Sequence, residues 1–181
     1  VAEGTFSSTV NTTKLSFKTG ASEAAAEKMS LTSAGNLILA STGGTFQTAT
    51  AGTSNFRAGV NAGNSIASGG NYNVVIGDEA GTAITTGDNN VAVGFEALMT
   101  EDAHGNNTAI GYRALKLLDA GAAGENTAIG YTAGGALDQG VKNTLVGSQA
   151  GDLLTHADFN VAVGYGALTA DTLGGKTTAI G

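Results

Sequence analysis

The sequence contains no cysteine and no proline, and only 13% of its 181 residues are charged. Without cysteine the chain has neither a disulfide framework nor thiolate chemistry. No apolar run approaches the 18 residues that a membrane-spanning helix requires. The formal charge of −7 and the pI of about 4.6 argue against nucleic acid or an anionic membrane as a partner, since both favour a basic patch.

Glycine, in contrast, is abundant, with 29 residues, and 41% of the chain is hydrophobic. No three-residue glycine period occurs, which excludes a collagen-like chain, and the periodic apolar residues exclude a disordered one. The sequence begins at Val1 without a methionine and stops at Gly181 in mid-repeat. We therefore expect it to be part of a longer polypeptide.

One phrase, Asn-(Thr/Val)-Ala-(Ile/Val)-Gly-x-x-Ala, is repeated eight times between Asn55 and Gly181. Its glycines lie 17 residues apart in five of the seven intervals, and 18 and 19 residues apart in the other two. These glycines are Gly59, Gly77, Gly94, Gly111, Gly130, Gly147, Gly164 and Gly181. So regular a period predicts an all-β chain that forms a parallel β-solenoid, or β-roll, with a 17-residue coil.

Asparagine occupies the position four residues before the glycine in seven of the eight copies, and Thr177 replaces it in the last. These residues are Asn55, Asn73, Asn90, Asn107, Asn126, Asn143 and Asn160. Stacked at one corner, they can form a ladder of side-chain hydrogen bonds, or each can cap its own turn. The glycine permits the backbone angles of a tight corner.

The residues between asparagine and glycine predict a short strand. Those three and one before the glycine are mostly β-branched and face the same side of a strand, so we expect both to point into the core. The residue two before the glycine then faces away, and its recurrent alanine predicts contact with other copies of the chain in a homotrimer. The predicted trimer-facing residues are Ala92, Ala109, Ala128, Ala162 and Ala179.

On the side of each coil away from the strand, a bulky aliphatic residue occupies either the fourth or the seventh position after the repeat glycine. Wherever the fourth residue after the repeat glycine is also glycine, the seventh is aliphatic. Wherever the seventh is acidic, as at Glu101 and Asp171, the fourth is leucine. One bulky aliphatic side chain per coil therefore fills a constant space, as close packing requires. Only the coil after Gly111 has both, and it is also the longest.

Residues 1–54 differ from the repeats and predict a separate N-terminal β shaft or connector segment, followed by the solenoid of residues 55–181. Residues 14–18 alternate polar and apolar, as a half-buried strand does. Residues 29–31 and 37–39 flank the turn sequence 33–36, which predicts a hairpin. Because two strands alone are marginally stable, this hairpin needs a partner such as its counterparts in other subunits. Residues 41–54, rich in threonine, glycine, serine and alanine, are predicted to form a connector or an irregular shaft segment.

The phrase Asn-Thr-Ala-Ile-Gly-Tyr, at residues 107–112 and 126–131, resembles the head repeats of YadA-like trimeric adhesins. The coil of this sequence is longer than theirs. The resemblance implies a left-handed parallel β-roll, three chains packed around one axis, and an extracellular adhesive role.

Residues 15–17 and 26–37 resemble shaft segments of phage tail fibres, which often carry the same repeat phrase next. This resemblance implies a virion structural protein: a homotrimeric tail-fibre segment that spaces and presents a receptor-binding tip for host attachment. Its partners would be other virion tail proteins, and a host-surface glycan or protein is a candidate receptor. The alternative is the head domain of a bacterial trimeric surface adhesin, located at the cell surface.

Residues for catalysis are scarce, and we expect no enzyme, no cofactor and no metal site. The two histidines, His104 and His156, lie in variable loops of different coils, where nothing in the sequence completes a ligand set. The acidic residues are scattered, whereas glycoside hydrolysis needs two carboxylates that converge across a cleft. Aromatic residues follow the glycine in four coils, where they either pack on neighbouring coils or stack against sugar rings: Phe95, Tyr112, Tyr131 and Tyr165.

Overall fold

The computed structural model describes residues 2–3, 14–19, 26–31, 37–39, 50–121 and 123–181. These residues form strands and turns and no helix, so this part of the chain has no helix that could cross a membrane. The chain divides into two units, Val1–Phe46 and Gln47–Gly181.

The first unit contains a four-stranded antiparallel sheet in the order β1-β2-β3-β4. Its strands are β1 (Ala2–Glu3), β2 (Lys14–Thr19), β3 (Ala26–Leu31) and β4 (Leu37–Leu39). Strands β3 and β4 pair with Leu31 opposite Leu37 and Met29 opposite Leu39, which is the pairing of the predicted hairpin. The predicted turn at 33–36 and residues 41–49 of the predicted connector lie outside the described residues.

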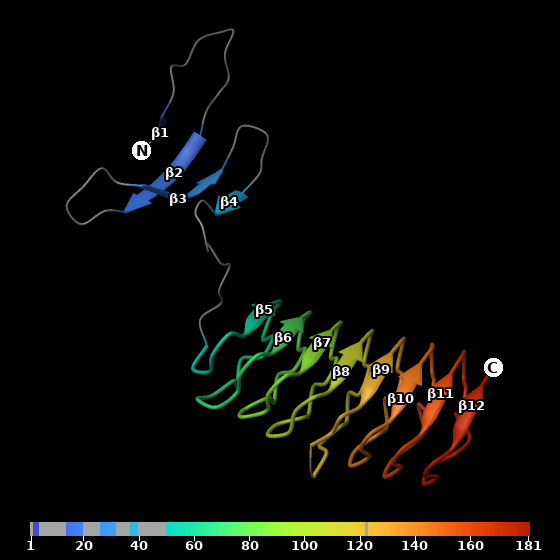
Figure 1. Ribbon diagram of the computed structural model, residues 1–181. Coiled ribbons are helices and arrows are strands. Elements are labelled where there is room, and N and C mark those ends of the chain that lie inside the picture. Colours follow the sequence, from blue (N-terminus) through green and yellow to red (C-terminus); the bar gives the residue numbers. More distant parts are fainter. Residues whose placement is uncertain (1, 4–13, 20–25, 32–36, 40–49, 122) are drawn as a thin grey trace, which may run out of the picture. The chain divides into compact units, whose positions relative to one another are not determined.

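The second unit is a parallel β-solenoid, in which each coil contributes one three-residue strand to a single eight-stranded sheet (Figure 1). The strands are β5 (Phe56–Ala58), β6 (Val74–Ile76), β7 (Val91–Val93), β8 (Thr108–Ile110), β9 (Thr127–Ile129), β10 (Thr144–Val146), β11 (Val161–Val163) and β12 (Thr178–Ile180). They follow one another in chain order, as the repeat period predicts.

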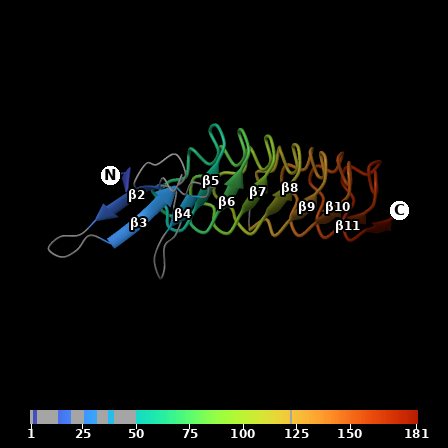
Figure 2. The same cartoon turned by 90° about the horizontal axis from the view of Figure 1, so that it is seen from above.

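Equivalent positions of the repeat lie directly opposite each other in every pair of strands. Ala92 pairs with Ala109, and Ala109 pairs with Ala128, even though the second of these intervals is the longest one. Added residues therefore enter the loops and leave the sheet in register. At about 4.8 Å between strands, the seven intervals extend roughly 34 Å along the stack of coils that Figure 2 shows from above.

The predicted orientation of the strand side chains is wrong. The residue two before the glycine points into the coil of its own chain, where Ala92, Ala109, Ala128 and Ala162 are fully buried. Ala179, in the last strand, is partly buried against the same core. The β-branched residues on either side point outward and stay half-buried or exposed. Alternation fixes which residues share a face, but it does not say which face is inside.

The interior is filled by three positions of each coil rather than two. Where the fourth residue after the repeat glycine is Gly81 or Gly151, the residue two before that repeat glycine is the larger Val75 or Leu145. A Cβ atom added at Gly81 would lie 3.0 Å from Val75, and one added at Gly151 would lie 2.9 Å from Leu145. Where the fourth residue is leucine, the residue two before the repeat glycine is alanine. Constant interior volume therefore sets the size of the side chain in the strand.

The glycine at each corner is required for two reasons. Its φ lies between 126° and 143° in all eight copies, a region that only glycine occupies readily. A Cβ atom there would also meet the carbonyl oxygen of the next corner glycine, at 2.2 Å for Gly130 and Gly147. Other positive-φ positions, such as Glu96 and Leu98, have φ near 50°, in the left-handed region that other residues can enter at modest cost.

We predict that Gly130→Ala destabilises the solenoid by about 2 kcal/mol or more, because a strained φ of this kind costs about 1–3 kcal/mol before any steric overlap. Chemical denaturation followed by circular dichroism measures the effect. The matched control is Gly121→Ala, since a Cβ atom at that exposed loop position meets nothing within 4 Å. Equal stability of the two variants would contradict the role assigned to the corner.

Candidate functional site

The predicted asparagine ladder is present and continuous. The side-chain oxygen of each asparagine accepts a hydrogen bond from the backbone N–H of the equivalent residue in the next coil, at 2.8–3.1 Å. The series starts at Asn55 and ends at Thr177, which has no side-chain carbonyl to extend it. All seven asparagines are buried. The ladder thus fixes each coil on the one before it.

The side-chain nitrogen of these asparagines closes the coil to which it belongs. In six of the seven it donates to a backbone carbonyl 14 or 15 residues further along, as from Asn126 to Gly140 at 2.9 Å. These six asparagines therefore both cap a turn and form a step of the ladder, so both sequence alternatives hold for them. Asn107 is the exception, because its buried Nδ2 has no partner.

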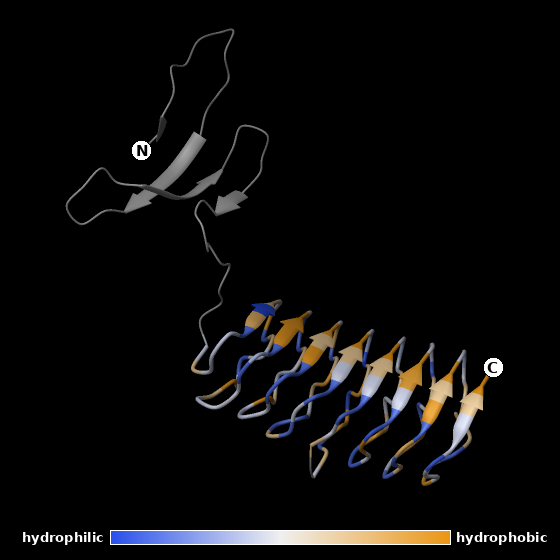
Figure 3. Cartoon of the chain, viewed as in Figure 1, coloured by the Kyte–Doolittle hydropathy of each residue, from blue (hydrophilic) through white to orange (hydrophobic). Residues whose placement is uncertain are grey.

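The outer face of the solenoid sheet is a row of uncharged side chains, β-branched in every strand after β5, contributed by the positions one and three before the corner glycine. Among them, Ile76, Ile110, Ile129 and Val163 each expose 36–39% of their surface. Figure 3 shows the strands mostly in orange and pale colours, with blue just before them, where the asparagines lie. Contiguous apolar surface of this kind commonly marks a contact between proteins.

A column of aromatic rings follows the corner beside that face. The ring centroids of Phe95 and Tyr112 lie 5.5 Å apart, and those of Tyr112 and Tyr131 lie 5.2 Å apart, with nearly parallel planes. Ser148 occupies the equivalent position of the next coil and interrupts the column before Tyr165, which is 76% exposed. The three stacked rings pack on neighbouring coils, which is the first of the two alternatives that the sequence left open.

A shallow hollow of about 370 Å³ lies beside Tyr131. It forms because Gly135 and Ala136 occupy positions where the preceding coil has Lys116 and Leu117. Tyr131 is 54% exposed at the edge of the hollow, so aromatic and polar groups line it together.

An ion-pair cluster borders this hollow. The Lys116 ammonium and the Arg113 guanidinium each lie 2.7 Å from Oε2 of Glu96 and hold the pKa of that carboxyl below its ordinary value of 4.5. Since the folded pKa is depressed, the stabilisation by this cluster is present above pH 4.5 and is lost as the pH falls through the folded pKa. The Arg113 guanidinium also lies 4.9 Å from the Tyr112 ring centroid, in a cation–π contact.

The two histidines lie in separate coils and have different surroundings. His156 is exposed, and its Nδ1 lies 3.4 Å from Oδ1 of Asp138. His104 is partly buried, and its Nδ1 lies 3.0 Å from Oε1 of Glu101, a fully buried carboxylate. Asp119, from the following coil, brings a second carboxylate within 4.8 Å of both groups. The sequence analysis missed this cluster, although Glu101 and Asp119 are 18 residues apart and thus about one coil apart.

A comparison with family models, with curated proteins and with solved structures finds no match for the chain. The resemblance to YadA-like adhesins therefore remains a hypothesis that rests on the repeat phrase, and the resemblance to tail fibres one that rests on residues 15–17 and 26–37 together with that phrase.

We predict that Asn126→Ala destabilises the solenoid by about 1–3 kcal/mol, since the backbone N–H of Asn143 and the carbonyl of Gly140 lose their partners inside the protein. Denaturant unfolding measures the change. Asn64→Ala, at an exposed turn, is the control and leaves stability within about 0.5 kcal/mol of the wild type. A neutral Asn126→Ala variant would show that the ladder contributes little.

Proposed function

We propose that this chain is a structural segment of a phage tail fibre, in which three copies pack side by side and space a receptor-binding tip from the virion. In this proposal the segment has no catalytic role. Its work is mechanical: the coils stack in fixed register, so that stiffness accumulates with the number of coils.

The observation that carries the proposal is the outer face of strands β5–β12. The residue one before the glycine is aliphatic in all eight strands, the residue three before is phenylalanine, valine or threonine, and none of them is charged. Monomeric proteins rarely leave so regular an apolar strip uncovered. Three identical strips facing a common axis would cover one another, and that arrangement agrees with the resemblance to trimeric YadA-like heads.

The N-terminal sheet fits the same proposal. Its four strands are short, and the repeat phrase comes next along the chain after the connector of residues 41–54, as in the tail-fibre shafts that residues 15–17 and 26–37 resemble. In the trimer, counterparts from the other chains would complete its packing.

Lysine substitutions on the outer face test the assembly. We expect the wild type to show about three times the 17.7 kDa chain mass in light scattering, and Ile110→Lys combined with Ile129→Lys to show the mass of one folded chain. The charges cannot be desolvated at an apolar interface without a partner.

Leu153→Lys is the matched control, because Leu153 is 50% exposed but lies in a loop rather than in the sheet, so this variant keeps the trimer mass. A wild type with the mass of one chain would contradict the proposal, and so would a double variant that still assembles.

The second candidate function is the head of a bacterial surface adhesin that contacts its receptor directly. The hollow beside Tyr131 favours it, because an exposed ring next to charged and amide groups suits the apolar face and the hydroxyls of a sugar. The coding sequence around the segment distinguishes the two candidates. A signal sequence upstream and a membrane anchor downstream indicate the adhesin, whereas neighbouring tail-protein segments indicate the fibre.

A further inference from the structure

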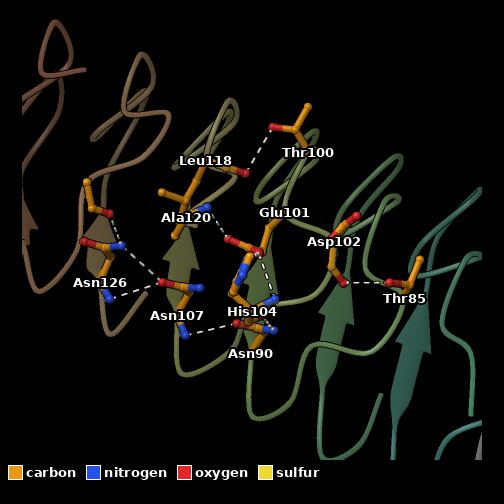
Figure 4. A network of polar contacts seen from close by, with 11 residues as sticks. Thr85, Asn90, Thr100, Glu101, Asp102, His104, Asn107, Leu118, Ala120 and Asn126 are labelled. Carbon is orange, nitrogen blue, oxygen red and sulfur yellow. Dashed lines mark hydrogen bonds and ion pairs between the residues drawn. The ribbon is translucent and has the colours of Figure 1, made fainter. Parts of the chain in front are cut away.

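The cluster of Glu101, His104 and Asp119 contains more groups that could bind a metal ion than are needed to cap its turn. Glu101 replaces the aliphatic residue found at this position in most coils, and Figure 4 shows its carboxylate between His104 and Ala120. Oε1 accepts a hydrogen bond from the backbone N–H of His104 at 3.0 Å, and Oε2 accepts one from the N–H of Ala120 at 3.1 Å. The carboxylate is fully buried, so its charge has lost the solvation of water.

Asp171 shows what the turn alone requires. It stands at the position equivalent to Glu101, and its carboxylate accepts the backbone N–H of Gly174, three residues later, at 2.8 Å. That turn has no histidine, and its carboxylate is only partly buried. An acidic residue therefore suffices to cap the loop. The turn of Glu101 adds the half-buried imidazole of His104, 3.0 Å from Oε1, and the exposed carboxylate of Asp119 from the next coil.

The longest coil supplies the third group, and the ladder step beside it is incomplete. The buried Nδ2 of Asn107 has no hydrogen-bond partner, whereas the Nδ2 of each of the other six ladder asparagines donates to a backbone carbonyl. Asn107 and His104 are neighbours, since Asn90 Nδ2 donates to the backbone carbonyl of His104 and Asn90 Oδ1 accepts from the backbone N–H of Asn107, at 3.0 Å each. A fully buried donor beside the cluster thus lacks an acceptor, which water or hydroxide bound to a metal ion would provide.

We infer that Glu101, His104 and Asp119 bind one divalent transition-metal ion, with zinc as the best match. One imidazole nitrogen and two carboxylate oxygens are ligands that zinc accepts, and three protein ligands leave a position for water. Their ligand atoms already lie within 4.8 Å of one another. The ion would neutralise the buried carboxylate of Glu101 and join two consecutive coils at the point where the added residues interrupt the regular packing.

Isothermal titration of the chelator-treated 181-residue protein with zinc chloride tests the inference. We expect one zinc ion per chain, an increase in melting temperature, and weaker binding on acidification because protons compete for the imidazole. His104→Ala and Asp119→Asn should each reduce the affinity at least tenfold, while circular dichroism shows an unchanged fold. Cobalt(II) in place of zinc should give visible d–d absorption in the wild type, and this absorption should be lost in His104→Ala.

His156→Ala is the matched control, since this histidine also lies beside a carboxylate, that of Asp138, but among the described residues no third ligand group completes the set. It should bind zinc as the wild type does. Absence of saturable binding to the wild type would overturn the inference. So would binding that survives both His104→Ala and Asp119→Asn, or binding that is lost in His156→Ala.

Discussion

The hydrogen bond from one asparagine amide to the side-chain oxygen of the preceding asparagine is the interaction on which the solenoid depends. It recurs at 2.8–3.1 Å from Asn73 to Thr177, inside the protein, where an unpaired polar group is costly. Because the same side chain also closes its own coil, the position of each turn and the position of the next are set together. The parallel sheet, with equivalent residues paired in every step, follows from this repeated constraint.

A coil with so short a strand has a narrow interior. The packing of that interior determines which residues lie on the outer face of the sheet. The buried strand position holds alanine wherever leucine fills the space from across the coil, and holds Val75 or Leu145 across from Gly81 or Gly151. In the coil of Ala128 and Gly134 the space is filled from the neighbouring coils, since a Cβ atom at Gly134 would lie 2.8 Å from both Leu115 and Leu145. The β-branched residues then have no place inside and form the outer face. The surface that we propose for assembly is therefore a consequence of how each coil packs. The aromatic column of Phe95, Tyr112 and Tyr131 lies next to this surface, just after the corner glycines.

The sequence predicts much of this architecture but not all of it. A constant period with glycine and asparagine in fixed places predicts the stacked coils, the corners and the ladder. It does not tell the two faces of a strand apart, because both carry apolar residues. The correct signal was present in the pairing of Val75 with Gly81 and of Leu145 with Gly151. The grouping of Glu101 with Asp119 follows only once the coils are stacked and the added residues of the long coil have been placed.

Native-state amide hydrogen exchange tests the central claim, that the buried asparagine ladder holds the coils in register. The backbone amides of Asn73, Asn90, Asn126, Asn143 and Asn160 should exchange only through cooperative opening of the coils, many orders of magnitude more slowly than the amide of the exposed Gly121. Their protection should remain in a variant that is monomeric, since the ladder lies within one chain. Exchange of these amides as fast as that of Gly121 would contradict the account.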